Sequence, residues 1–134
     1  MVSHLRRTVI GLLGLYWLAL FVGTHIPITL KGGHGSDKVL HFLAYAGLAF
    51  LMSLVVGGRR PTWRAFVLVL VVTLTYAGFD EFSQLLVGRH CDFWDWVADF
   101  VGVGFGLFGY WVVAVIYQFW LLAGNRPKAE IATR

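Results

Sequence analysis

Two groups of residues have types and spacing that could carry chemistry. In the first group Asp37, His41 and Tyr45 are four residues apart, which places them on one face of a helix. In the second group Asp80 and Glu81 stand side by side within an apolar stretch. An imidazole beside a carboxylate can act as a general base, and carboxylates with one imidazole can hold a divalent cation.

A third group forms the longest helical pattern in the sequence. Its members follow alternating steps of three and four residues and change from acids to glycines: Asp92, Asp95, Asp99, Gly102, Gly106 and Gly109. Glycines at four-residue spacing let two helix backbones approach closely in lipid. We therefore expect this face to close a helix bundle at its glycine end and to open into a polar pocket at its aspartate end.

These groups lie in a strongly apolar chain. Of its 134 residues, 58% are hydrophobic and 13% are charged, and the mean hydropathy of +0.72 is far above that of soluble domains. Apolar stretches long enough to cross a bilayer cover residues 8–30, 39–57, 65–87 and 96–122. The sequence predicts an all-α fold, in which residues 1–134 form one domain, a bundle of four transmembrane helices.

The basic residues indicate the orientation of this bundle. Eight of the eleven would lie on one side of the membrane: Arg6, Arg7, Arg59, Arg60, Arg64, Arg126, Lys128 and Arg134. Because short loops rich in Lys and Arg stay cytoplasmic, we expect both termini to be cytoplasmic and residues 31–38 and 88–95 to form outward loops. The chain would be a multi-pass protein of a bacterial cytoplasmic membrane. This topology accounts for the positive net charge, so we expect no nucleic-acid partner.

The depth of Asp80 and Glu81 in the bilayer makes them unusual. The third span reaches the required length only if its helix continues to about Val87, which places both acids roughly 10 Å below its outer end. An unpaired ionised side chain at such depth costs a few kcal/mol. The two acids must be paired, protonated, metal-bound or exposed to a wet cavity.

Structural roles are alternatives for several of these residues. Asp37, Asp92 and Asp95 could serve only to cap helix N-termini, where a negative charge is favourable. His41 could form no more than an interhelical hydrogen bond. Asp80 and Glu81 could pair structurally with Arg89 or Lys38.

Three segments in order, DKVLHFLAY, DEFSQ and GRHCDFWDWVADFVG, resemble the motifs of the VanZ-like family of small multi-pass membrane proteins. The resemblance runs from about Asp37 to Gly106. It covers these residues: Asp37, Lys38, His41, Tyr45, Asp80, Glu81, Gln84, Arg89, Asp92, Asp95, Asp99 and Gly102. Asp92 stands where the family often has Ser and Asp99 where it often has Asn, so this pocket would be more negative than is usual.

The resemblance implies a cell-envelope function linked to tolerance of the glycopeptide teicoplanin. With the polar pocket, it leads us to expect binding or modification of a membrane lipid or a lipid-linked cell-wall precursor. We expect His41, Asp80 and Glu81 to carry any catalysis. We expect ligand contacts from Asp37, Lys38, Tyr45, Gln84, Arg89, Asp92, Asp95 and Asp99.

Two other functions remain open from the sequence. The protein could be an enzyme that uses His41 with Asp80 or Glu81, or a divalent cofactor such as Mg²⁺, Mn²⁺ or Zn²⁺, and the spacing selects no particular metal. It could instead be a scaffold whose polar groups specify packing, with another membrane protein or a second copy of itself as partner. The sequence alone does not decide whether the protein is an enzyme.

Overall fold

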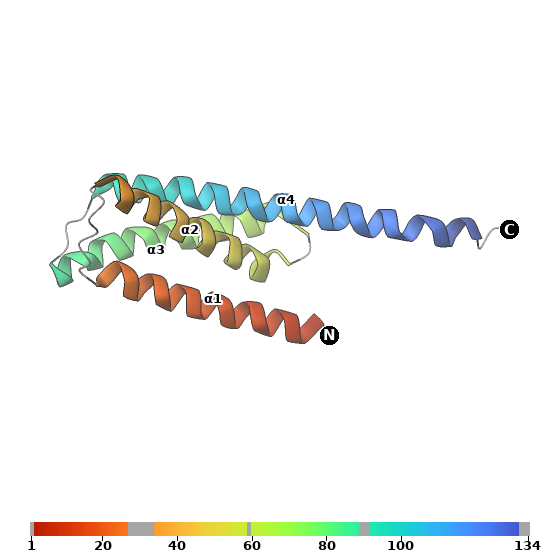
Figure 1. Ribbon diagram of the computed structural model, residues 1–134, viewed down its shortest axis with the longest axis horizontal. Helices are drawn as coiled ribbons and strands as arrows, with labels where there is room; N and C mark the ends of the chain where they lie inside the picture. Colours follow the sequence, from red (N-terminus) through yellow and green to blue (C-terminus); the bar gives the residue numbers. More distant parts are fainter. Residues whose placement is uncertain (1, 27–33, 59, 89–91, 132–134) are drawn as a thin grey trace.

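The protein is built from four long helices (Figure 1). The computed structural model describes residues 2–26, 34–58, 60–88 and 92–131. In this part of the chain the helices are α1 (Val2–His25), α2 (His34–Val56), α3 (Trp63–Gln84) and α4 (Phe93–Ile131), and a short 3₁₀ helix, η1 (Leu85–Val87), continues α3.

Each α-helix contains a segment long and apolar enough to span a membrane. These segments are His4–His25, Ser36–Val56, Trp63–Val87 and Phe93–Gly124. The expected all-α fold with four membrane-spanning helices is confirmed in these terms. Residues 27–30, the end of the first predicted span, lie outside the described residues.

Two helices begin earlier than the apolar stretches suggest. We expected residues 31–38 and 88–95 to be loops, but α2 already includes Asp37 and α4 already includes Asp95. This expectation is therefore wrong for the ends of both segments. Acidic side chains stabilise the positively polarised first turn of a helix, so both helices extend past their apolar segments.

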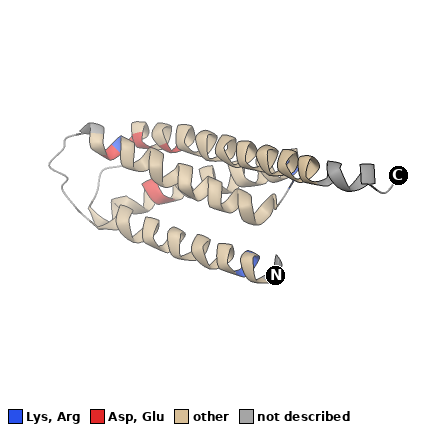
Figure 2. Ribbon diagram, turned by 45° about the vertical axis from the view of Figure 1, so that its right-hand side comes forward, with Lys and Arg blue, Asp and Glu red and all other residues tan. Residues whose placement is uncertain are grey.

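The helices alternate in direction. Both chain ends lie toward one end of the bundle, together with the turn between α2 and α3 (Figure 1). At the opposite end α1 and α3 finish, while α2 and α4 begin. We call this opposite end the polar end, because the acidic residues of α2, α3 and α4 gather there (Figure 2).

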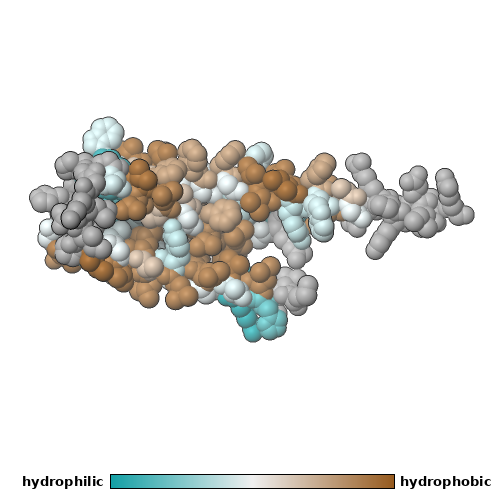
Figure 3. All heavy atoms as spheres, viewed as in Figure 1, coloured by the Kyte–Doolittle hydropathy of each residue, from teal (hydrophilic) through white to brown (hydrophobic). Residues whose placement is uncertain are grey.

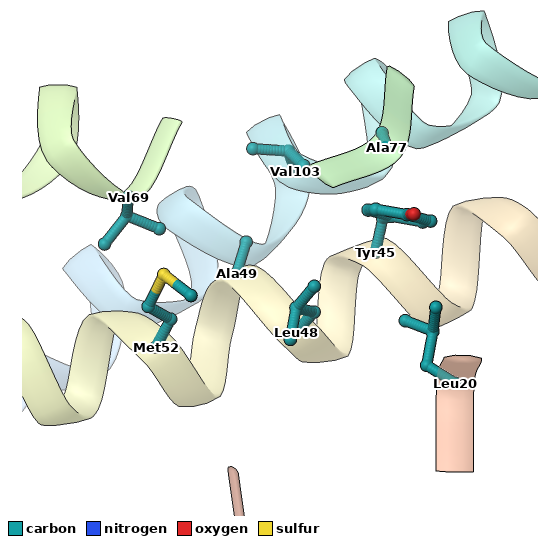
Figure 4. Close-up of a cluster of buried hydrophobic side chains, with 8 residues drawn as sticks. All are labelled: Leu20, Tyr45, Leu48, Ala49, Met52, Val69, Ala77 and Val103. Carbon is teal, nitrogen blue, oxygen red and sulfur yellow. The ribbon is translucent and has the colours of Figure 1, made fainter. Parts of the chain in front are cut away.

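The apolar core between the helices is small. It contains Leu20, Tyr45, Leu48, Ala49, Met52, Val69, Ala77 and Val103, drawn in Figure 4. Most other large apolar side chains point outward and cover the surface of the bundle (Figure 3). An apolar exterior of this kind suits contact with lipid chains.

The glycine face of α4 packs directly on α2, the most extensive helix contact in the described chain. A Cβ atom added at Gly102 would strike the carbonyl oxygen of Phe42, and one added at Gly106 would strike that of Ala46. The predicted close approach at these glycines is confirmed. Because each obstacle is main chain, a side chain could be accommodated only by moving the helices apart.

Helix α1 is held less tightly. Its Tyr16 hydroxyl donates a hydrogen bond to the carbonyl oxygen of Ala44 on α2, at 2.9 Å. Within the described chain, a Cβ added at Gly11 or Gly14 would meet nothing within 4 Å. An apolar pocket of about 430 Å³ also lies between α1, α2 and α4, with Leu5 and Tyr110 in its lining. Helix α1 is therefore the least closely packed member of the bundle.

Replacing one glycine of the α2 contact should loosen the bundle. Gly106→Ala would force α4 away from α2, and overpacking of this kind costs typically about 1–3 kcal/mol. Gly104→Ala is the matched control, because a Cβ there meets nothing within 4 Å in the described structure. The melting temperature in detergent, followed by circular dichroism, should fall for Gly106→Ala alone. Equal melting temperatures for the two variants would contradict the packing described here.

Candidate functional site

All four helices contribute polar side chains to the polar end. We call the following set the polar cluster: Thr24, His25, Asp37, Lys38, His41, Asp80, Glu81, Ser83, Gln84, Asp92, Asp95 and Asp99. Because α2 and α4 start at this end while α1 and α3 finish there, segments far apart in the sequence meet. Acidic residues of three helices lie together in Figure 2 for this reason.

Lys38 forms two ion pairs at the rim of the cluster. The Lys38 amine on α2 donates hydrogen bonds to Asp92 at 2.8 Å and to Asp95 at 2.9 Å. The side chains of Lys38 and Asp92 are 33% and 39% exposed, whereas that of Asp95 is only 8% exposed. The lysine thus bridges the surface and the interior of the cluster.

The floor of the cluster is centred on His41. Its Nδ1 atom lies 3.0 Å from Oδ1 of Asp99 and 3.8 Å from Oε1 of Glu81. On the other side of the ring, Nε2 lies 4.0 Å from Oδ2 of Asp95. All four side chains are buried. The separation of Nδ1 and Oδ1 of Asp99 is that of a hydrogen bond, and the tautomer of His41 decides which of its two ring nitrogens carries the proton.

The two neighbouring acids of α3 accept hydrogen bonds from uncharged donors among the described residues. The Gln84 amide donates to both, at 3.4 Å to Asp80 and 3.3 Å to Glu81. Glu81 also accepts a hydrogen bond from the backbone N–H of Asp92, at 3.2 Å. Both acids are buried within the third span, as their position in the sequence predicts.

Helix α1 supplies residues that sequence reasoning missed. The Thr24 hydroxyl donates to Oδ1 of Asp80 at 2.9 Å. Nδ1 of His25 lies 2.8 Å from the Phe21 carbonyl oxygen, and Nε2 lies 2.9 Å from the Ser83 hydroxyl. The sequence offered only a weak signal for this contact, two adjacent polar residues near the end of an apolar stretch.

Some buried polar atoms have no hydrogen-bond partner in the described structure. They are the hydroxyls of Tyr45 and Tyr76 and Oδ2 of Asp99. Tyr45 lies one turn below His41 on α2 and is fully buried. A buried polar atom without a hydrogen bond destabilises the fold. A bound group that formed hydrogen bonds with these three atoms would remove that cost.

Two groups of side chains have the types and separations for a metal ion. The ligand atoms of His41, Glu81 and Asp99 lie within 4.8 Å of one another, and all three residues are buried. The ligand atoms of Asp37, His41 and Asp95 form a second group, and they too lie within 4.8 Å of one another. His41 belongs to both.

The structure thus brings together all but two of the residues that we selected from the sequence. Tyr45 lies deeper than the rest, within the apolar core (Figure 4). Arg89 lies outside the described residues. Lys38, one of the two bases that could have paired with Asp80 or Glu81, pairs with Asp92 and Asp95.

Comparison with known proteins adds one match. The sequence profile of the VanZ/LLP1 family matches residues 6–117, a range that contains the whole polar cluster. No curated protein and no solved structure matches the chain. The family match thus extends beyond the three motifs into α1 and most of α4.

The contact between α1 and Asp80 can be tested with an isosteric change. Thr24→Val removes a donor to a buried carboxylate, and a lost hydrogen bond of this kind destabilises by about 1–3 kcal/mol. The control Thr75→Val, at an exposed position of α3, should stay within about 0.5 kcal/mol of wild type. Unfolding in detergent checks both values. Equal stability of the two variants would show that Thr24 does not support Asp80.

Proposed function

The chain belongs to the VanZ/LLP1 family, and we propose that its polar cluster binds or modifies the polar head of a cell-envelope lipid or lipid-linked cell-wall precursor. One observation carries this proposal. The cluster combines a partly exposed charged rim with a buried floor that contains unpartnered oxygen atoms. Unpartnered buried oxygen atoms next to an accessible charged rim favour a bound polar group over a purely structural role.

The chemistry of the cluster favours particular head groups. Oδ2 of Asp99 can accept a hydrogen bond, and the Tyr45 hydroxyl can both donate and accept. Hydroxyl, amide and amine groups of a sugar or peptide head would satisfy these atoms. At the rim, Lys38 is partly exposed and can approach a phosphate or carboxylate as a point charge.

The surroundings of the cluster suit a lipid more than a water-soluble ligand. Phe82 and Leu86 on the last turns of the third span are 70% and 85% exposed, and Trp94 beside the rim is 62% exposed. Aromatic side chains at this level are typical of membrane interfaces. The chains of a lipid would lie along these side chains while its head group reaches the cluster.

The proposal includes an orientation. The helices span a membrane in alternating directions, and the excess of Arg and Lys at the opposite end favours a cytoplasmic location for both termini. The polar cluster would then face the outer side of the bacterial cytoplasmic membrane. Cell-wall precursors are used on that side, and the family resemblance links such a site with tolerance of teicoplanin.

The orientation can be tested through the single cysteine of the chain, Cys91. A membrane-impermeant maleimide should label Cys91 in intact cells. In the Cys91→Ser/Arg60→Cys variant, labelling should require permeabilised cells, because position 60 lies in the turn at the opposite end of the bundle. The reverse labelling pattern would place the polar cluster on the cytoplasmic side.

Lipid binding can be tested by native mass spectrometry of protein released gently from detergent. Wild type and the Thr75→Val control should retain a co-purified lipid, whereas Asp80→Asn/Glu81→Gln should lose it, because this variant removes two charges and weakens the Gln84 contacts. Circular dichroism must show equal helix content. Equal lipid occupancy in all three proteins would refute binding at this cluster.

The same mass spectrometry experiment distinguishes two alternative functions, an enzyme and a scaffold. His41 contacts both Asp99 and Glu81, and this geometry favours an enzyme in which His41 acts as general base. Turnover would appear as a change in the mass of the lipid after incubation with wild type. Bare protein in every sample, with Asp80→Asn/Glu81→Gln less stable, would instead favour a scaffold.

A further inference from the structure

We propose that His41, Glu81 and Asp99 bind one divalent transition-metal ion, Mn²⁺ or Zn²⁺, in the interior of the polar cluster. The three side chains come from α2, α3 and α4, so the ion would join three helices at one point. Metal binding is a property distinct from the lipid binding proposed above.

The separations fit a common ion. Ligand atoms bonded to one ion at about 2.1 Å lie at most about 4.2 Å apart. Nδ1 of His41 is 3.0 Å from Oδ1 of Asp99 and 3.8 Å from Oε1 of Glu81. The full set lies within 4.8 Å, so a small side-chain rotation brings every ligand atom into range.

An unpartnered atom independently points to a ligand at this place. Asp99 is fully buried, and its Oδ2 atom has no hydrogen-bond partner within the described residues, although Oδ1 of the same carboxylate contacts His41. A metal ion bound between His41, Glu81 and Asp99 would give this carboxylate a further partner.

Neighbouring groups would orient the ligands. Metal-binding histidines usually donate their second N–H to a carboxylate. Asp95 lies 4.0 Å from Nε2 of His41, and Lys38 holds Asp95 through a 2.9 Å hydrogen bond. Glu81 is positioned by the Gln84 amide and by the backbone of Asp92. Glu81 is therefore held by two hydrogen bonds, whereas Asp95 would have to move closer than 4.0 Å to accept a hydrogen bond from Nε2 of His41.

The charge balance of the cluster also favours a cation. Among the described residues the basic groups of the cluster are Lys38, His25 and His41, against six carboxylates: Asp37, Asp80, Glu81, Asp92, Asp95 and Asp99. Three of these acids, Asp80, Glu81 and Asp99, are 4% exposed or less. Buried charges in proteins are paired or coordinate metals, and a divalent ion would offset two of these negative charges.

The mixture of donor atoms selects the class of metal. Mg²⁺ and Ca²⁺ prefer ligand sets made entirely of oxygen. An imidazole nitrogen favours transition metals, and carboxylates also suit Mn²⁺. One nitrogen with two carboxylates therefore favours Mn²⁺ or Zn²⁺. The second group, with Asp37 and Asp95, is less suitable because Asp37 is only partly buried.

A bound ion would also explain how so acidic a site could accept a lipid phosphate. In this role the inference rests on the proposed function, because the positive charge of the ion would attract the phosphate that the carboxylates repel. Metal binding itself does not require the lipid.

The test is metal binding by full-length protein in detergent without added lipid. The protein is stripped with EDTA and titrated with MnCl₂ or ZnCl₂ in a calorimeter, and elemental analysis after desalting gives the stoichiometry. We expect one ion per chain for wild type. Glu81→Gln and Asp99→Asn should each weaken binding about tenfold or more. Asp80→Asn is the matched control, because it removes an equally buried charge from the adjacent residue of the same helix.

A spectroscopic measurement identifies the ligand. Electron spin-echo spectra of the Mn²⁺-loaded protein should contain coupling to one nitrogen, and His41→Gln should abolish it. If Asp99→Asn does not fold, Glu81→Gln and His41→Gln still test the site.

Four results would overturn the proposal. In the first, wild type binds neither Mn²⁺ nor Zn²⁺; in the second, both carboxylate variants bind metal as tightly as wild type. In the third, Asp80→Asn loses as much metal affinity as Glu81→Gln and Asp99→Asn; in the fourth, the nitrogen coupling survives in His41→Gln. An equal loss in Asp80→Asn would indicate diffuse attraction of adventitious ions. Lipid retention, measured separately by mass spectrometry, can succeed or fail independently of these results.

Discussion

Charged side chains in an apolar medium need partners, and this requirement organises the polar end of the protein. Asp80, Glu81 and Asp99 are almost fully buried within candidate membrane spans. None of them could be tolerated on an isolated helix, because an unpaired charge at this depth costs several kcal/mol. Gln84 on the same helix supports Asp80 and Glu81, but Thr24 and His41 reach Asp80 and Asp99 from other helices, so the complete cluster requires the assembled bundle.

Close packing of α2 on α4 makes these partnerships geometrically available. Gly102 and Gly106 bring the α4 backbone against the backbone of α2, and the aspartates that continue the same face lie beside Lys38 and His41. The glycines of α4 thus allow close contact with α2, while the aspartates nearer the polar end lie in the space between the two helices. A wider helix separation would remove His41 from reach of Asp99.

Features encoded by periodicity could be predicted from the sequence, whereas contacts between helices could not. The close packing of α4 at Gly102 and Gly106 follows from their spacing, and the extent of the third span to Val87 follows from its length; both agree with the structure. The role of Thr24 was missed because α1 has no polar stripe, and its contact with Asp80 depends on where α1 settles. The ion-pair partners of Lys38 could not be predicted either, because the sequence places several acids near the same end of the bundle and does not show which of them Lys38 contacts.

The two sides of the cluster differ in how closely their helices pack. His41 and Asp99 lie on α2 and α4, whose backbones are in direct contact, whereas Thr24 and His25 lie on the less closely packed α1. If α1 tilted outward, Asp80 would lose its hydroxyl donor while the contact between His41 and Asp99 stayed intact. The support of Asp80 therefore depends on the position of α1, whereas the pairing of His41 with Asp99 depends only on α2 and α4.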